Sequence, residues 1–132
     1  MNRPLTTDET VKMEVTDAVE TFMRAFNGGD VAAVVDLYAE DCIVAAPGAD
    51  PIVGRSGLTA FWERMIREAG MSEVAHTILD VTPVGRDVAT EVTRFAATIG
   101  GVRHAGAYLV QWKRVDGAWR LHRDVFNAAP AA

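Results

Sequence analysis

Residues 100–127 have the sequence GGVRHAGAYLVQWKRVDGAWRLHRDVFN, which contains two β-rich stretches joined by Asp116-Gly117. An Asp-Gly pair between two strand-forming segments is typical of a tight hairpin turn. The sequence therefore predicts a long antiparallel hairpin made of residues 102–115 and 118–127.

Two more β-rich stretches precede this hairpin, at residues 73–83 and 87–99. Gly85-Arg86-Asp87 separates them, and Gly100-Gly101 joins the second of them to the hairpin. Both junctions have the composition of turns. The second half of the chain is therefore predicted to be a meander of four antiparallel strands.

The first half of the chain has a helical pattern instead. Apolar residues recur at steps of three and four over residues 8–27, Thr6 and Glu9 have the spacing of a capping box, and Asp30 is placed to cap a second short helix. A short apolar strand at residues 42–46 and a third helix at residues 57–69 follow.

Helices first and strands last predict an α+β fold, with the helices gathered on one side of an antiparallel sheet. The chain has 132 residues, which fits one domain. We place this single domain at residues 8–127 and expect residues 1–7 and 128–132 to be loose tails.

Composition narrows the range of partners and sites. The net charge of −5 and the lack of a basic run argue against a nucleic-acid partner, because such binding depends on clustered Lys and Arg. No apolar run approaches the length of a membrane span, so we expect no membrane partner and a cytoplasmic location. The single cysteine, Cys42, has no partner for an intramolecular disulfide.

The order of elements resembles the nuclear transport factor 2-like superfamily, and three motifs resemble its ketosteroid isomerase-like and SnoaL-like members. These motifs are Phe26-Asn27-Gly28-Gly29-Asp30 leading into Asp36-Leu37-Tyr38-Ala39-Glu40-Asp41, Ile52-Val53-Gly54-Arg55 followed by Phe61-Trp62, and the ending from Tyr108 to Asn127. The resemblance implies a cone-shaped fold, in which a curved sheet wraps around the helices and encloses a pocket for a small apolar molecule. It also implies a homodimer through the outer face of the sheet.

The last strand alternates between two sets of residues. Trp119, Leu121 and Val125 would lie on one face, and His122, Asp124 and Phe126 on the other. On the pattern alone either set could face the core. The resemblance favours the second set, which leaves Trp119, Leu121 and Val125 as an exposed apolar patch that a dimer would bury.

The register of the hairpin decides which polar residues meet in the pocket. A three-residue loop, Val115-Asp116-Gly117, would place Tyr108 opposite Asp124, whereas a two-residue loop would not. We expect the three-residue loop, together with a similar three-residue loop around Gly100-Gly101. By the resemblance, Val92 and Arg94 would then point inward, with Glu91, Thr93 and Phe95 pointing outward.

These expectations give a candidate catalytic cluster of Arg94, Tyr108, His122 and Asp124. Asp124 would orient or deprotonate a substrate, and Arg94 would bind developing negative charge. A buried ion pair that only organises the pocket is an equally open interpretation of Arg94 and Asp124. The ligand-binding wall would include Phe22, Phe26, Tyr38, Ala46, Trp62, Met65, Val92, Val110, Trp112 and Phe126.

Some positions depart from the family pattern. Ala46 stands where the resemblance places the carboxylate base of ketosteroid isomerase, and Phe22 stands where it places a tyrosine that binds the oxyanion. Steroid isomerase activity is therefore not expected.

The histidines share no metal-ligand spacing, so we expect neither a metal nor a cofactor. Two functions stay open. The first is proton transfer, isomerisation or hydration and dehydration of an apolar oxygenated metabolite; the second is a non-catalytic module for ligand binding or dimerisation.

Overall fold

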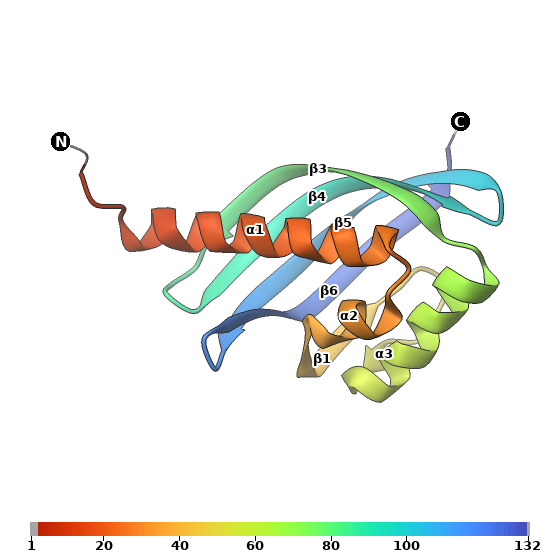
Figure 1. Cartoon of the computed structure of the whole chain (residues 1–132), viewed down its shortest axis with the longest axis horizontal. Coiled ribbons are helices and arrows are strands. Elements are labelled where there is room, and N and C mark those ends of the chain that lie inside the picture. The colour runs from red at the N-terminus through yellow and green to blue at the C-terminus, as the bar shows by residue number, and fades with distance from the viewer. Residues whose placement is uncertain (1–2, 132) are drawn as a thin grey trace.

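A computed structural model describes residues 3–131 and shows three helices and a curved, unclosed six-stranded sheet (Figure 1). The predicted α+β fold with helices on one side of the sheet is confirmed. The elements in chain order are α1 (Thr7–Asn27), α2 (Val31–Asp36), β1 (Tyr38–Ala45), β2 (Ile52–Val53), α3 (Gly54–Glu63), the π-helical turn η1 (Arg64–Glu68), β3 (Ser72–Pro83), β4 (Val88–Ile99), β5 (Val102–Val115) and β6 (Ala118–Pro130).

Helices α1 and α2 begin where their capping side chains predict, whereas α3 begins at Gly54, earlier than predicted and without a side-chain cap. The Thr6 hydroxyl accepts a hydrogen bond from the backbone N–H of Glu9, whose carboxylate accepts one from the backbone N–H of Thr6. Asp30 caps α2 through Ala33. The predicted third helix, by contrast, is α3 continued by η1, so its last turn has the wider π-type hydrogen bonding.

The strands are arranged in the order β2-β1-β6-β5-β4-β3, and β1 runs parallel to β6 while every other neighbouring pair is antiparallel. Helix α1 lies across the concave face of the long strands, and α2 and α3 lie beside its C-terminal end (Figure 1). The core fills the space between α1 and that face. Its largest fully buried side chains include Trp112, Tyr38, Leu58 and Leu121.

The turn between β5 and β6 differs from the predicted one. Val115 pairs with Ala118, so the loop has two residues, and Asp116 and Gly117 both have positive φ angles, of 51° and 80°. Two positive φ angles are the requirement of a type I′ turn, whose twist matches that of the strands. The three-residue loop was therefore the wrong expectation.

A β-bulge further along β6 reverses the consequence of that turn. Gln111 pairs with Arg123, but the next pair is Trp112 with Leu121, which leaves His122 as an extra residue. The bulge switches the side to which the following residues point. Trp119 and Leu121 therefore face inward before it, and Asp124 and Phe126 face inward after it.

The Gly100-Gly101 loop also has two residues rather than three, because Ile99 pairs with Val102. This register places Thr93, and not Arg94, opposite Tyr108. The predicted orientation of β4 was therefore wrong. Glu91, Thr93 and Phe95 are buried on the inner face, whereas Arg94 is exposed and Val92 is half-buried on the outer face.

The C-terminal boundary of the domain also differs from the predicted one. Strand β6 continues to Pro130, and the backbone N–H of Ala131 donates to the carbonyl of Arg103. Residues 128–131 are therefore attached to the sheet and are not a loose tail; residues 1, 2 and 132 of the predicted tails lie outside the described part of the chain.

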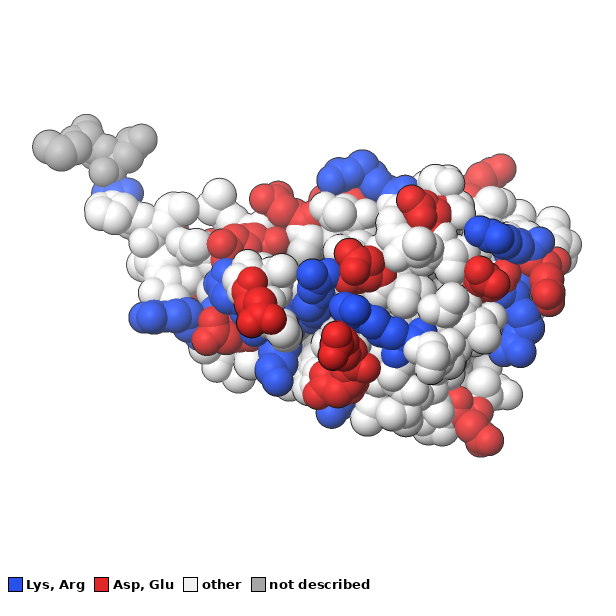
Figure 2. All heavy atoms as spheres, turned by 60° about the horizontal axis from the view of Figure 1, so that its bottom comes forward, with Lys and Arg blue, Asp and Glu red and all other residues white. Residues whose placement is uncertain are grey.

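Acidic and basic side chains are interspersed on the face shown in Figure 2. Such mixing differs from the single-sign surface that attracts a phosphate backbone. Among the described residues, no helix has both the length and the apolar character needed to cross a membrane. That a nucleic acid or a membrane is not a partner stays a prediction.

Candidate active site: a buried aspartate in an aromatic cavity

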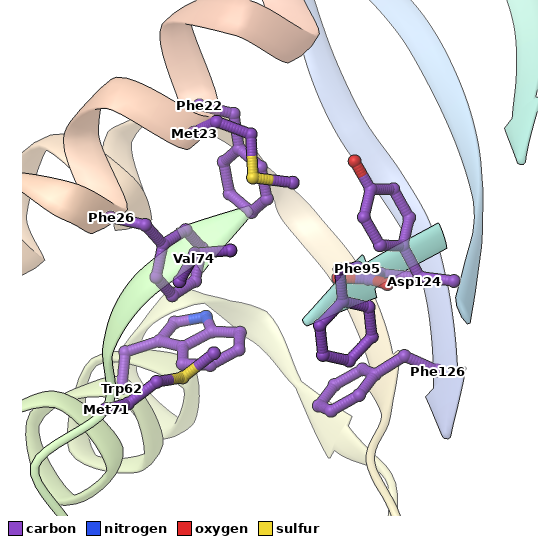
Figure 3. Close-up of a pocket in the computed structure, with 10 residues that line it drawn as sticks. Phe22, Met23, Phe26, Trp62, Met71, Val74, Phe95, Asp124 and Phe126 are labelled. Atoms are coloured by element: carbon purple, nitrogen blue, oxygen red, sulfur yellow. The ribbon is translucent and has the colours of Figure 1, made fainter. Parts of the chain in front are cut away.

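A cavity lies between α1, the α3 segment and the inner face of the sheet (Figure 3). It has about 400 Å³ of empty space, including the part that opens to solvent. The lining residues are largely aromatic or sulfur-containing, with a single carboxyl group: Phe22, Met23, Phe26, Trp62, Met71, Val74, Phe95, Tyr108, Asp124 and Phe126. Aromatic rings contribute apolar surface with defined shape, so the lining is chemically suited to an apolar ligand.

The helices and the sheet supply opposite walls. Phe22, Met23, Phe26 and Trp62 lie on one side, and Phe95, Asp124 and Phe126 lie across from them (Figure 3). The rings also brace one another, for example Phe22 against Phe26 and Phe26 against Trp62, both in edge-to-face geometry with centroids 4.9 and 4.7 Å apart. These contacts hold the wall in a fixed shape.

Asp124 is the charged group of this cavity, and it is 5% exposed. The hydroxyl of Tyr38 donates a 2.8 Å hydrogen bond to its Oδ2. Burial raises the pKa of Asp124 to about 7, even though the Tyr38 hydrogen bond lowers it. The carboxyl is thus divided between its acid and carboxylate forms near neutral pH.

The pairing of β1 with β6 explains why Tyr38 and Asp124 meet. Val44 on β1 pairs with Asp124, and Tyr38, at the start of the strand, pairs with Leu121. An irregularity in β1 between these two pairs accompanies the His122 bulge in β6. Both inward-facing side chains can therefore meet beside the cavity.

Three buried polar atoms have no hydrogen-bond partner within the described part of the chain. They are Oδ1 of Asp124, the hydroxyl of Tyr108 and Nε1 of Trp62, and all three belong to residues that line the cavity. Buried polar atoms without partners are rare in folded proteins and call for an explanation. A ligand or a water in the cavity could satisfy them, since together they offer two donors and one carboxyl oxygen.

Glu91 is a second buried carboxyl on the same face of the sheet and is 0% exposed. Its Oε1 accepts a 2.8 Å hydrogen bond from Nε1 of Trp112, and its Oε2 accepts one from the hydroxyl of Thr93. Burial raises the pKa of Glu91. Sequence reasoning missed this residue because the reversed face of β4 placed it outside.

The predicted catalytic cluster is divided between the two faces of the sheet. Tyr108 and Asp124 are buried beside the cavity, as expected. Arg94 is exposed on the outer face. His122, at the bulge, is also directed outward, where its Nδ1 lies 3.1 Å from Oε1 of Gln111 and its Nε2 lies 3.2 Å from Oδ2 of Asp41. The predicted pair of Arg94 and Asp124 therefore does not form.

The predicted wall residues fall into three groups. Phe22, Phe26, Trp62 and Phe126 line the cavity. The others on the inner side pack beside or beneath it: Tyr38, Ala46, Val110 and Trp112 are buried, and Met65 is partly buried against the core. Val92 lies on the outer face, for the reason given for β4. The wall also contains residues that the sequence did not indicate: Met23, Met71, Val74 and Phe95.

Residues 3–131 contain no group of three or more His, Cys, Asp or Glu side chains arranged to hold a metal ion. The polar groups of the cavity are a carboxyl, a phenol and an indole N–H, which can take part in proton transfer and hydrogen bonding.

Comparison with known proteins finds a matching family model and similar proteins. A family model described as the SnoaL-like domain matches residues 19–122. Epoxide hydrolase LasB of Streptomyces lasalocidi is 31% identical over 128 residues, a match that takes in 84% of this chain and 44% of LasB. The chain thus spans less than half the length of that relative.

Solved structures share the fold. A ketosteroid isomerase-like protein from Erwinia carotovora atroseptica SCRI1043 superposes with a TM-score of 0.78 at 23% identity, covering 91% of this chain and 97% of that one. A Nostoc punctiforme PCC 73102 domain of unknown function with a cystatin-like fold gives a TM-score of 0.77 at 14% identity, covering 97% and 81%. At these identities the likeness concerns the fold alone.

Proposed function

Because this chain belongs to the SnoaL-like domain family, with an ionisable group buried in its cavity, we propose that it is a proton-transfer enzyme. Its substrate would be a small, uncharged, ring-bearing molecule with a reactive oxygen, and its reaction an isomerisation, a hydration or a dehydration. Asp124 would be the acid and base of that reaction.

The main support for this proposal is the environment of the Asp124 carboxyl. One oxygen is held by Tyr38, while the other is buried and free of hydrogen bonds within the described structure, and Asp124 is one of the residues that line the cavity. A pKa of about 7 makes the acid form available for donation and the carboxylate available for acceptance at neutral pH. Tyr108 and Trp62 have further donors for a substrate oxygen.

The lining of the cavity argues for an uncharged substrate. None of its described lining residues is Lys or Arg, and Asp124 adds negative charge when it ionises. An anionic ligand would therefore lose its hydration without gaining a counter-ion, which is costly in an apolar site.

The likeness to an epoxide hydrolase favours epoxides as the first substrates to test. In such a reaction, a C–O bond of the ring breaks and its electron pair goes to the oxygen, which takes the proton of Asp124. A water molecule adds to the carbon, and the proton that this water gives up restores the acid. The product would be a diol, with no oxidant or reductant needed.

The experiment is a turnover assay on a panel of neutral cyclic and aryl epoxides between pH 5 and 9, with diol detected by mass spectrometry. We expect turnover by the wild type and a loss of about 10²–10⁴-fold in Asp124→Asn, the range typical of general acid–base catalysis. Asp17→Asn, which removes an exposed carboxylate of α1, is the matched control and should retain full activity.

Equal turnover by the wild type and Asp124→Asn would overturn the role of Asp124. If no epoxide reacts but neutral ring compounds raise the melting temperature, the ligand-binding alternative is favoured instead, because a ligand that binds only the native state stabilises it by RT ln(1 + [L]/Kd).

A further inference from the structure

Glu91 is buried in β4 with two neutral partners and no cation bonded to it. Trp112 and Thr93 donate to its two oxygens, and its side chain is 0% exposed. A carboxyl in such surroundings is costly in its charged form. Packing alone would be served better by an apolar residue, so the presence of an acid here calls for a reason beyond stability.

The sheet places Glu91 in one row with Asp124. Glu91 pairs with Val110 across β4 and β5, and Val110 pairs with Asp124 across β5 and β6. Neighbouring strands lie about 4.8 Å apart, so the backbones of the two acids are about 10 Å apart. In the next row Thr93 pairs with Tyr108, whose hydroxyl has no hydrogen-bond partner in the described structure.

We infer that Glu91 is a positioning residue of the Asp124 site: a second buried carboxyl, one strand removed, whose charge adds to burial in favouring the acid form of Asp124. This inference rests on the proposed function of Asp124. Glu91 would not touch the substrate, since it does not line the cavity; it would act through the field that it creates at Asp124.

The ionisable groups around Glu91 fit this role. From β3, His76 is near enough to lower the pKa of Glu91 slightly, but His76 is itself 3.0 Å from Glu20 of α1 and partly exposed. Tyr108 on β5 is un-ionised, because burial and the Glu91 charge raise its pKa. Asp124 on β6 is a further neighbour, and the Glu91 charge adds to the rise of its pKa after burial.

Two like charges in a poorly solvated space do not ionise independently. After one carboxyl has lost its proton, the second loses its own at a higher pH, and the apparent pKa values then belong to the pair. Over about 10 Å at an effective dielectric constant of about 20, the coupling corresponds to about one pH unit.

The test is Glu91→Gln, which removes the charge and keeps an oxygen to accept from Trp112 and an amide to donate to Thr93. Carbon-13 NMR of labelled aspartate would follow the Asp124 carboxyl from pH 4 to 9, with Asp124→Asn used to assign the signal. We expect the midpoint to fall by about one pH unit in Glu91→Gln. Glu68→Gln, an exposed change of the same charge in η1, should leave the midpoint where it is.

A folded Glu91→Gln protein with an unchanged Asp124 midpoint would overturn the inference. If that variant does not fold, the titration of the wild-type protein is the test. Coupled carboxyls each show a second inflection at the other's midpoint. A titration curve of Glu91 with a single inflection would therefore contradict the inference. An Asp124 that stays ionised throughout this range would instead contradict the proposed function. The two failures are thus distinguishable.

Discussion

The hydroxyl of Tyr38 donates a 2.8 Å hydrogen bond to Oδ2 of Asp124, across a parallel pair of strands that are far apart in the sequence. Tyr38 is fully buried, and burial, followed by the Asp124 charge, raises its own pKa, so the phenol stays protonated and acts as a permanent donor. It fixes one oxygen of the carboxyl, while the other has no hydrogen-bond partner in the described structure.

Tyr38→Phe should therefore destabilise the protein and change the acidity of the site. Loss of the donor leaves both oxygens of Asp124 without a partner, which costs about 1–3 kcal/mol of unfolding free energy. Because the Tyr38 hydrogen bond lowers the pKa of Asp124, its removal should raise that pKa above about 7. Urea denaturation and the NMR titration of Asp124 measure the two effects.

Tyr108→Phe is the matched control for this prediction. The Tyr108 hydroxyl is buried but has no hydrogen-bond partner in the described structure, so its removal should cost little or no stability. Equal losses of stability in the two phenylalanine variants would contradict the difference in hydrogen bonding between these two tyrosines.

The unfolding free energy should depend on pH through the ionisation of Asp124. Its pKa is about 7 in the folded protein and about 4 in the unfolded chain, so the folded state holds the proton more tightly. The stability that this proton contributes is fully present below about pH 4 and is lost as the pH rises through 7. Three pKa units correspond to about 4 kcal/mol.

Asp124→Asn should remove this dependence. Chemical denaturation at a series of pH values between 4 and 8 would show a flatter curve for the variant than for the wild type, with the largest gain in relative stability above pH 7. If the two curves ran parallel throughout this range, the carboxyl would have the same pKa in both states, and the assignment of a buried acid would be wrong.

The sequence was sufficient to predict the order of helices and strands, because periodicity, caps and turn residues are local signals. It was not sufficient for the faces of the strands. Asp116-Gly117 allows either a two-residue or a three-residue loop, and nothing local marks His122 as the bulged residue. The two-residue loop and the bulge have opposite effects on which face of β6 a residue occupies. Asp124 therefore lies on the predicted inner face although the predicted loop is wrong.

The same limit explains why Glu91 was missed. Its strand has polar and apolar residues on both faces, so alternation does not identify the buried side. The partner that makes burial of Glu91 tolerable, Trp112, belongs to another strand and is brought to it only by the register of β4 and β5. A buried polar pair of this kind depends on tertiary contacts that periodicity does not report.

Gly106 should be intolerant of any side chain. A Cβ atom at this position would lie 1.9 Å from the backbone carbonyl oxygen of Asn127 on the neighbouring strand, which is far closer than atoms in contact can approach. Gly106→Ala should therefore push β5 and β6 apart and lower the unfolding free energy by about 1–3 kcal/mol.

Gly57→Ala in α3 is a suitable comparison for this substitution. Its Cβ would lie 3.2 Å from a methyl group of Ile52, a side chain that can adjust, and alanine favours the helix by up to about 1 kcal/mol. Urea denaturation should give a change within about 1 kcal/mol of zero for Gly57→Ala. An equally small change for Gly106→Ala would show that the strands relax without cost.

A row of apolar residues crosses the outer face of the sheet, and it should form the interface of a homodimer. Val125 and Leu109 pair across β6 and β5, and they are 53% and 49% exposed. Ala45 and Val92 extend the row on either side. The predicted interface residues Trp119 and Leu121 are buried within the chain itself, so of the original three only Val125 can contribute.

Light scattering coupled to size exclusion should give the mass of a dimer for the wild type and of a monomer for Val125→Asp, because a charge at the centre of the row would be buried without a partner. The side chain of Val125 is already exposed, so the fold should tolerate the change. Val84→Asp is the control: Val84 is 64% exposed but lies in the turn after β3, outside the row, and its variant should remain dimeric. A wild type that is monomeric at high concentration would exclude this interface.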